Sequence, residues 1–134
     1  MAKSLIQTSN QTTQNVNENS IIDLGTVIRR YGCNLRLVGN GIEAVGEGYY
    51  EITGTVSVSP TTPGPVSVAI YDNGVQIPGA IAYGTTAAAD DIVTLPLVTT
   101  IRQGCRCQGI DSLTAVLIEG AGEVSNISLR VEKS

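Results

Sequence analysis

The chain has 134 residues, the length of one ordinary domain, and a formal net charge of −4 with only 15% charged residues. Its basic residues are scattered apart from Arg29-Arg30, which excludes the concentrated positive surface that nucleic-acid binding requires. The sequence has no His, and this removes the commonest general base and the commonest metal ligand. We therefore expect no enzyme activity, no catalytic residues, no metal site and no cofactor.

The composition favours strands over helices. Val, Ile, Leu, Ala, Thr and Gly dominate, and β-branched side chains fit a pleated sheet. No stretch has sustained helical periodicity, and Gly, Pro or Asn-Gly interrupts the chain about every 8–12 residues, a spacing typical of an all-β sandwich. No apolar run reaches the roughly 18 residues of a membrane helix, and the polar sequence after Met1 is not a signal peptide. We expect a protein made in a cytoplasm, without a membrane partner.

The N-terminal segment differs in composition from the rest of the chain. Residues 1–20 are rich in Gln, Asn, Thr and Ser with isolated apolar positions, as in a segment that orders only against a partner. We expect residues 1–20 to form a polar arm and residues 21–134 to form the folded domain. Leu5, Ile6 and Val16 are the arm residues that we expect to attach to a capsid or fibre protein.

Alternating apolar residues between turn signals predict strands through the rest of the chain. In the clearest one, residues 49–59, Tyr50, Ile52, Val56 and Val58 share one face and polar residues share the other. Eight to ten antiparallel strands are enough for two stacked sheets. The segments concerned are 21–24, 26–31, 34–38, 42–45, 49–59, 66–71, 75–77 with its continuation 80–85, 92–102, 113–119 and 124–132.

Turn chemistry separates these strands. Asn40-Gly41 and Asp72-Asn73-Gly74 predict tight hairpins because Asn and Gly tolerate positive φ. Residues 60–65 contain three prolines and predict a loop, and Pro78-Gly79 predicts a break in pairing. Pro96 within a long strand predicts an edge or a bulge, since proline donates no hydrogen bond to a neighbour.

The next-to-last predicted strand is apolar on both faces: Leu113, Ala115 and Leu117 alternate with Val116 and Ile118. This pattern predicts cover on both sides. A two-sheet monomer supplies one covering layer, and a closed cyclic oligomer would supply the second. A monomer whose own loops cover the second face is the alternative.

The segments 48–58, 68–74 and 113–119 resemble the jelly-roll heads of the tumour necrosis factor and complement globular-head superfamily. The resemblance covers about residues 21–134. It extends to a bacterial and phage branch: C-terminal domains of collagen-like spore-surface glycoproteins, and phage head-fibre or capsid-decoration proteins. Because Gly-X-Y repeats are absent, a freestanding virion protein is favoured over the spore glycoprotein.

The resemblance implies a jelly-roll β-sandwich of about ten strands that forms a homotrimer. The expected function is that of a virion structural accessory protein, a trimeric knob on the capsid surface attached by its arm. The alternative is a receptor- or carbohydrate-binding head, of a phage fibre or a spore-surface protein, with a host-surface glycan as partner. The residues expected at the trimer interface are Tyr49, Leu113, Ala115, Leu117, Ile127 and Leu129.

A few residues could carry chemistry of their own. Asp72, Asp111 and Asp90-Asp91 are carboxylates beside loop signals, where solvated acids are usual, and calcium binding by Asp90-Asp91 is an alternative. The three cysteines are an odd number and predict free thiols; a zinc site lacks a fourth ligand, and a disulfide from Cys33 to either of the others stays open. Of the adjacent Tyr49 and Tyr50, we expect one ring in the core and one at the interface, with a sugar-stacking platform as the alternative.

Overall fold

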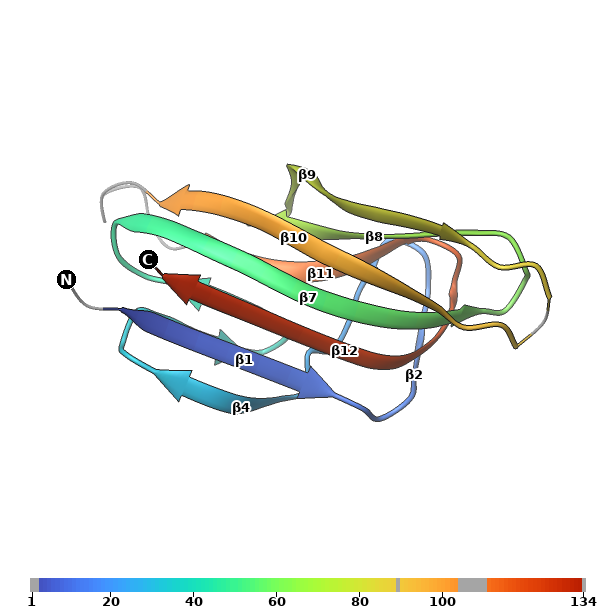
Figure 1. The fold of residues 1–134 in the computed structure, drawn as a ribbon, viewed down its shortest axis with the longest axis horizontal. Coiled ribbons are helices and arrows are strands. Elements are labelled where there is room, and N and C mark those ends of the chain that lie inside the picture. The colour runs from blue at the N-terminus through green and yellow to red at the C-terminus, as the bar shows by residue number, and fades with distance from the viewer. Residues whose placement is uncertain (1–2, 89, 104–110, 134) are drawn as a thin grey trace.

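The computed structural model describes residues 3–88, 90–103 and 111–133, and twelve antiparallel strands in these ranges form two stacked sheets (Figure 1). Sheet A has the order β10-β7-β12-β1-β4, with β2 paired to β12; sheet B has the order β5-β6-β11-β8-β9, with β3 paired to β11. This part of the chain contains no helix that could cross a lipid bilayer. The strands are β1 (Ser4–Asn10), β2 (Gln14–Val16), β3 (Ser20–Ile21), β4 (Thr26–Tyr31), β5 (Leu35–Val38), β6 (Gly41–Ala44), β7 (Gly48–Pro60), β8 (Pro65–Asp72), β9 (Val75–Thr85), β10 (Val93–Gln103), β11 (Asp111–Glu119) and β12 (Gly122–Lys133).

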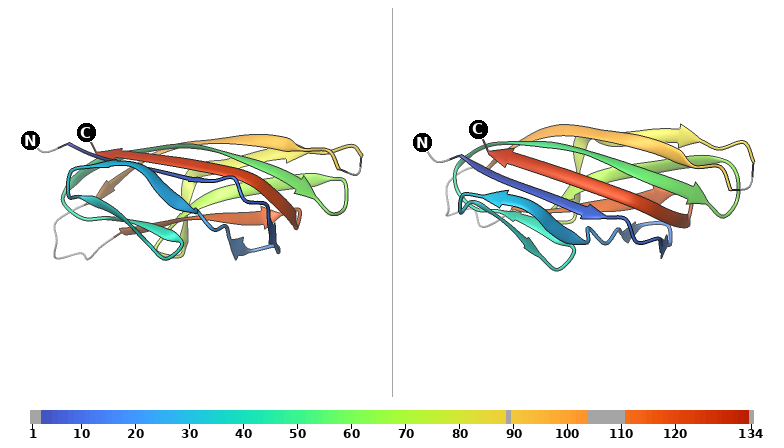
Figure 2. Two further views of the ribbon diagram at one scale, coloured as in Figure 1. Left: turned by 90° about the horizontal axis from the view of Figure 1, so that it is seen from below. Right: turned by 60° about the horizontal axis from the view of Figure 1, so that its bottom comes forward.

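The core lies between the two layers, which Figure 2 shows from two further directions. Four alternate residues of β7, Tyr50, Ile52, Val56 and Val58, have no exposed surface, as the alternation predicts. Tyr50 is the only tyrosine among the buried residues of the described core, and the sequence has no Phe or Trp. Its hydroxyl donates to the carbonyls of residues 45 and 46, at 3.1 and 2.8 Å, so the buried oxygen is satisfied.

Short turns close the hairpins of sheet B. Asn73 and Gly74 have φ of 52° and 84° and join β8 to β9, which confirms the predicted hairpin. The β5–β6 turn falls one residue earlier than predicted, on Gly39-Asn40. Gly41 belongs to β6 instead, where a Cβ would come within 2.8 Å of a side-chain oxygen of β11. Its lack of a side chain serves close strand packing and not the turn.

The prolines of β9 and β10 act as predicted. β10 is an edge strand of sheet A, and Pro96 lies exposed in its middle, paired with Thr55 of β7. An edge strand needs hydrogen bonds on one side only, so the missing N–H is tolerated. In β9 the register with β8 shifts next to Pro78-Gly79, where Gly79 has a φ of 82°.

The N-terminal segment is part of the sandwich, so the predicted arm of residues 1–20 and the predicted domain start at Ile21 are wrong. β1 lies between β12 and β4 and pairs with seven residues of β12 and five of β4. Ile6 and Thr8 are fully buried. The segment looks like a linker because Ile6 is the only large apolar side chain that β1 turns inward; its other inward residues, Ser4 and Thr8, are polar.

The apolar strand β11 is covered within one chain, which corrects the prediction that it needs a partner. Its inward residues face the core, its outward Val116 is only 6% exposed, and Ile118, the other apolar residue predicted on that face, is half-buried. Val116 pairs with Ile21 of β3 on one side and with Ala69 of β8 on the other. Because β11 is the central strand of sheet B, these in-plane neighbours shield it without a third layer.

Candidate functional site

Five of the six side chains predicted at a subunit interface lie in the core of the single chain. They have no exposed surface, so they offer nothing for another copy to contact, and this part of the prediction is wrong. The five are Leu113, Ala115 and Leu117 of β11 and Ile127 and Leu129 of β12. Tyr49, the sixth, is 55% exposed on the outward face of sheet A, and Arg102 lies over its ring at 5.9 Å from the centroid.

The residues predicted to attach the chain to a capsid are also mostly internal. Ile6 is fully buried and Val16 is 5% exposed, both within the core, so they are unavailable to a partner and that prediction is wrong for them. Leu5 is half-buried on the outward face of sheet A, where it pairs with Tyr31 of the edge strand β4. An attachment surface on this chain has to be part of the folded sandwich.

The outward face of sheet A divides into two halves. Toward the β7–β8 turn, one uncharged row across five strands consists of Pro96, Thr55, Ser128, Ser9 and Thr26, and Glu123, opposite Ser59, is an exposed acid nearer the turn. Toward the other end it carries two ion pairs, Arg130 with Glu132 at 2.8 Å and Arg102 with Glu47 at 3.8 Å. The uncharged row can contact another surface without burying an unpaired charge.

Exposed apolar residues gather on this face and along the neighbouring edge, where β9 of sheet B meets β10 of sheet A. Val98 of β10 is 69% exposed on the face; Tyr83 of β9 and Ile92, just before β10, are 74% and 62% exposed at the edge. The two edge strands are in contact there, because a Cβ on Gly84 would lie against the side chains of Val93 and Leu95. The sequence analysis missed these residues, although Val98 breaks the polar outward pattern of its strand.

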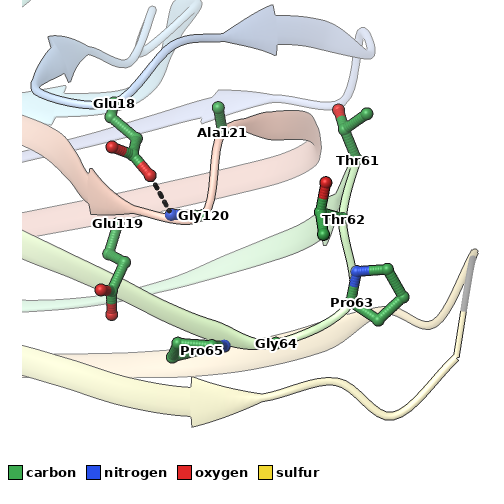
Figure 3. Close-up of a pocket in the computed structure, with 9 residues that line it drawn as sticks. All are labelled: Glu18, Thr61, Thr62, Pro63, Gly64, Pro65, Glu119, Gly120 and Ala121. Carbon is green, nitrogen blue, oxygen red and sulfur yellow. Dashed lines mark hydrogen bonds between the residues drawn. The ribbon is translucent and has the colours of Figure 1, made fainter.

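A pocket of about 330 Å³ lies at the end of the sandwich formed by the β7–β8 and β11–β12 turns (Figure 3). Glu18, which joins β2 to β3, completes it. Ser4 of β1 pairs with Lys133 of β12 at the opposite end, so a whole strand length separates the pocket from the chain ends (Figure 1). The lining residues are Glu18, Thr61, Thr62, Pro63, Gly64, Pro65, Glu119, Gly120 and Ala121.

Hydrogen bonds between the turns hold the pocket in shape. The Thr61 amide donates to the Ala121 carbonyl at 3.0 Å, which ties the two turns together. The Gly64 amide donates to Thr86 Oγ1 at 3.1 Å, and the Gly120 amide donates to Glu18 Oε1 at 3.4 Å. The predicted loop at residues 60–65 is therefore a fixed wall of a pocket, which no pattern in the sequence indicated.

Two of the predicted carboxylates come together at the other end of sheet B. Asp72 ends β8 and Asp111 begins β11. Asn73, next to Asp72, donates from its side-chain Nδ2 to Asp111 Oδ1 at 3.5 Å, and its Oδ1 accepts from the Ser112 backbone amide at 2.9 Å. Burial raises the pKa of Asp72 to about 6, and the charge of Asp111 and a hydrogen bond with it add to the rise. Asp91 instead accepts from the amides of residues 87 and 88 in its own loop.

The predicted thiol and metal chemistry is only partly within the described structure. Cys33 is a free, exposed thiol, whereas Cys105 and Cys107 lie outside the described residues. Among the described residues no three of His, Cys, Asp and Glu gather as metal ligands. Calcium binding by Asp90-Asp91 has no third acidic ligand in this part of the chain.

No family model matches the sequence, and no curated protein matches it. The fold has solved counterparts. Murine APRIL matches with a TM-score of 0.73 and 12% identity over 99% of this chain and 100% of that one. The globular domain of zebrafish complement 1qA protein matches with a TM-score of 0.69 and 7% identity over 96% and 94% of the two chains. PRD1 vertex protein P5 matches with a TM-score of 0.62 and 14% identity over 97% and 96%.

These likenesses define the fold and confirm its prediction. The chain is a two-sheet antiparallel jelly roll of the kind found in tumour necrosis factor-like proteins and complement 1q heads. The match to all three extends over the N-terminal strands, in agreement with the place of β1 inside sheet A.

Proposed function

We propose that the chain is a structural accessory protein of a phage virion, a head fibre or capsid decoration, whose three copies form one jelly-roll knob on the capsid surface. The observation that carries this proposal is the likeness to PRD1 vertex protein P5 over nearly the whole of both chains. That protein is by its name a vertex protein, and we take the shared fold as a guide to a similar structural role. The proposal assigns no catalytic role, in keeping with a chain that has no His.

The trimeric part of the proposal is supported by two different apolar surfaces. A cyclic trimer joins unlike patches, so each copy has to present one patch to each neighbour. Sheet A presents Tyr49, beside Arg102, and Val98, and the β9–β10 edge presents Tyr83 and Ile92. We assign the edge of one copy to the sheet A face of the next.

Attachment to the particle is then made by a folded surface. Residues 4–21 are bound into both sheets by β1, β2 and β3, so they are not free to reach a capsid. The proposal therefore keeps the capsid or fibre partner and replaces the arm with the exterior of the sandwich.

Immunogold labelling of purified phage particles tests the virion assignment. Antibodies raised against the purified chain are expected to decorate intact particles at regular positions, and mass spectrometry of the same particles should find the chain. Particles that carry no label and no peptides of the chain, from lysates in which the chain is abundant, would overturn the assignment.

A receptor- or carbohydrate-binding head is the second candidate, because the pocket of Figure 3 is a defined hollow at the end far from Ser4 and Lys133. A head mounted by its other end would present this pocket outward. The two candidates are compatible, since a virion knob can also bind a surface.

A further inference from the structure

The pocket at the β7–β8 and β11–β12 turns has a chemistry that selects its ligand. We propose that it binds an amino sugar, a ring that carries a protonated amine beside several hydroxyl groups. This inference deepens the second candidate function and rests on it, and it does not depend on the trimer or on the virion.

The lining is poor in hydrogen-bond donors. Pro63 and Pro65 have no amide hydrogen, and the amides of Thr61, Gly64 and Gly120 already donate to protein acceptors. No Lys or Arg lines the pocket. A ligand rich in acceptors, such as a phosphate or a carboxylate, would find few donors on this lining, most of whose residues are exposed to solvent.

The same lining is rich in acceptors. Glu18 and Glu119 each bring a carboxylate, and no ion pair involves either of them in the part of the chain that the structure describes. Glu18 is held by one long contact of 3.4 Å to Gly120, which leaves most of its acceptor capacity for a ligand. An ammonium group carries the donors and the charge that two such carboxylates attract.

The arrangement favours an organic cation over a metal ion. Figure 3 shows the Glu18 and Glu119 side chains on opposite sides of the Gly120 turn, so their carboxylates do not converge on one point. Calcium needs about six to eight oxygens around one centre, whereas a sugar ring spreads its amine and hydroxyls over its rim. The ligand is therefore extended and has donors at more than one position.

The volume of the pocket and its proline and threonine lining residues suit one sugar ring. A volume of about 330 Å³ is at the small end of ligand pockets, which run from roughly 300 to 1,000 Å³. The rings of Pro63 and Pro65 give apolar contact for the C–H face of a sugar. The hydroxyls of Thr61 and Thr62 both donate and accept, as sugar hydroxyls require.

Three sugars that differ mainly in charge test the inference. The amides of Thr62, Gly64, Gly120 and Ala121 are followed by NMR in the full chain while D-glucosamine, D-glucose or D-glucuronate is added at low ionic strength and neutral pH. We expect millimolar binding of glucosamine at these amides, weaker binding of glucose, and binding of glucuronate at least about tenfold weaker than that of glucosamine.

Glu18→Gln and Glu119→Gln provide the charge test, since Gln keeps an acceptor for the turn. Each is expected to weaken glucosamine binding about threefold to tenfold and to leave glucose binding nearly unchanged. Glu51→Gln is the matched control, because Glu51 is an exposed acid on β7, nine residues before Pro60, and its loss should have no effect.

Several results would overturn the inference. These are equal shifts with glucosamine and glucuronate, no shifts at the pocket amides, a loss of binding in Glu51→Gln equal to that in Glu18→Gln, or tighter binding of calcium chloride than of glucosamine. The particle labelling is a separate experiment. If particles are labelled but the pocket amides do not shift with glucosamine, this inference is wrong and the virion proposal is unaffected.

Discussion

Replacing Asp72 with Asn is expected to stabilise the protein above neutral pH and to have little effect near pH 4. One carboxylate oxygen of Asp72, Oδ1, is buried and has no hydrogen-bond partner in the described residues. Burial, together with the neighbouring Asp111, raises the pKa of Asp72 from 3.8 to about 6. Folding therefore favours the protonated carboxyl, and the stability it contributes is present below about pH 4 and is lost as pH rises through about 6.

The size of the effect follows from the difference between the folded and unfolded pKa. A difference of about two corresponds to about 3 kcal/mol of unfolding free energy. Asp72 is only half-buried, so solvent screening reduces this figure, and we expect about 1–1.5 kcal/mol. Asparagine is uncharged at every pH, so the variant escapes the loss above pH 6.

Urea unfolding followed by circular dichroism from about pH 4.5 to about pH 8 measures this difference. The unfolding free energy of Asp72→Asn should exceed that of the original chain by an amount that grows with pH. Asp90→Asn is the control, because Asp90 is exposed in a loop at a φ of 68° that Asn also tolerates. A difference that does not change with pH, or that has the opposite sign, would refute the reasoning.

Three further changes test the fold. Removing residues 2–10 deletes β1 from the middle of sheet A, so no cooperative urea transition is expected; a native-like transition would show that β1 is dispensable. Gly54→Ala should cost about 1–3 kcal/mol, because its Cβ would lie 2.5 Å from the Ser128 carbonyl oxygen, and an unchanged urea midpoint would contradict this contact. Tyr50→Phe should cost about 1 kcal/mol through the unsatisfied carbonyl of Gly46, since the Val45 carbonyl still accepts from Asn34 Nδ2 at 2.6 Å, and equal stability would show that water replaces the hydroxyl.

Local patterns in the sequence predicted the parts of the fold that depend on local chemistry. The alternation in β7 identifies its core face, and Asn73-Gly74 identifies a hairpin because few other residue pairs tolerate both positive φ values. Pro96 predicts an edge strand or a bulge, since its missing donor excludes it from a regular central strand, and β10 is an edge strand.

The predictions that were wrong concern residues whose burial is set by strands distant from them in sequence. β1 turns Ser4 and Thr8 toward the core, and their burial follows from the strands on either side of β1. The outward face of β11 is shielded by Ile21 and Ala69, two residues far from it in sequence. Without the sheet order, an apolar strand covered by its own sheet looks the same as one covered by another subunit.

In the candidate sites too, features set by local sequence could be predicted, and features set by contacts distant in sequence could not. Tyr49 could be predicted as an exposed ring because its neighbour Tyr50 takes the core position. The pocket could not, because Glu18, the Thr61–Pro65 loop and the Gly120 turn meet only in the folded chain. Glu18 also lies in the segment whose composition suggested an arm.

The mass of the chain in solution tests the trimer most directly. Light scattering at micromolar concentration should give three copies of the 14.0 kDa chain, about 42 kDa. Val98→Glu places a charge on the exposed face of sheet A and should give a folded single chain, whereas Val38→Glu, at the β5–β6 end of sheet B, should keep the trimer. A folded chain with the mass of one copy, before any substitution, would contradict the account.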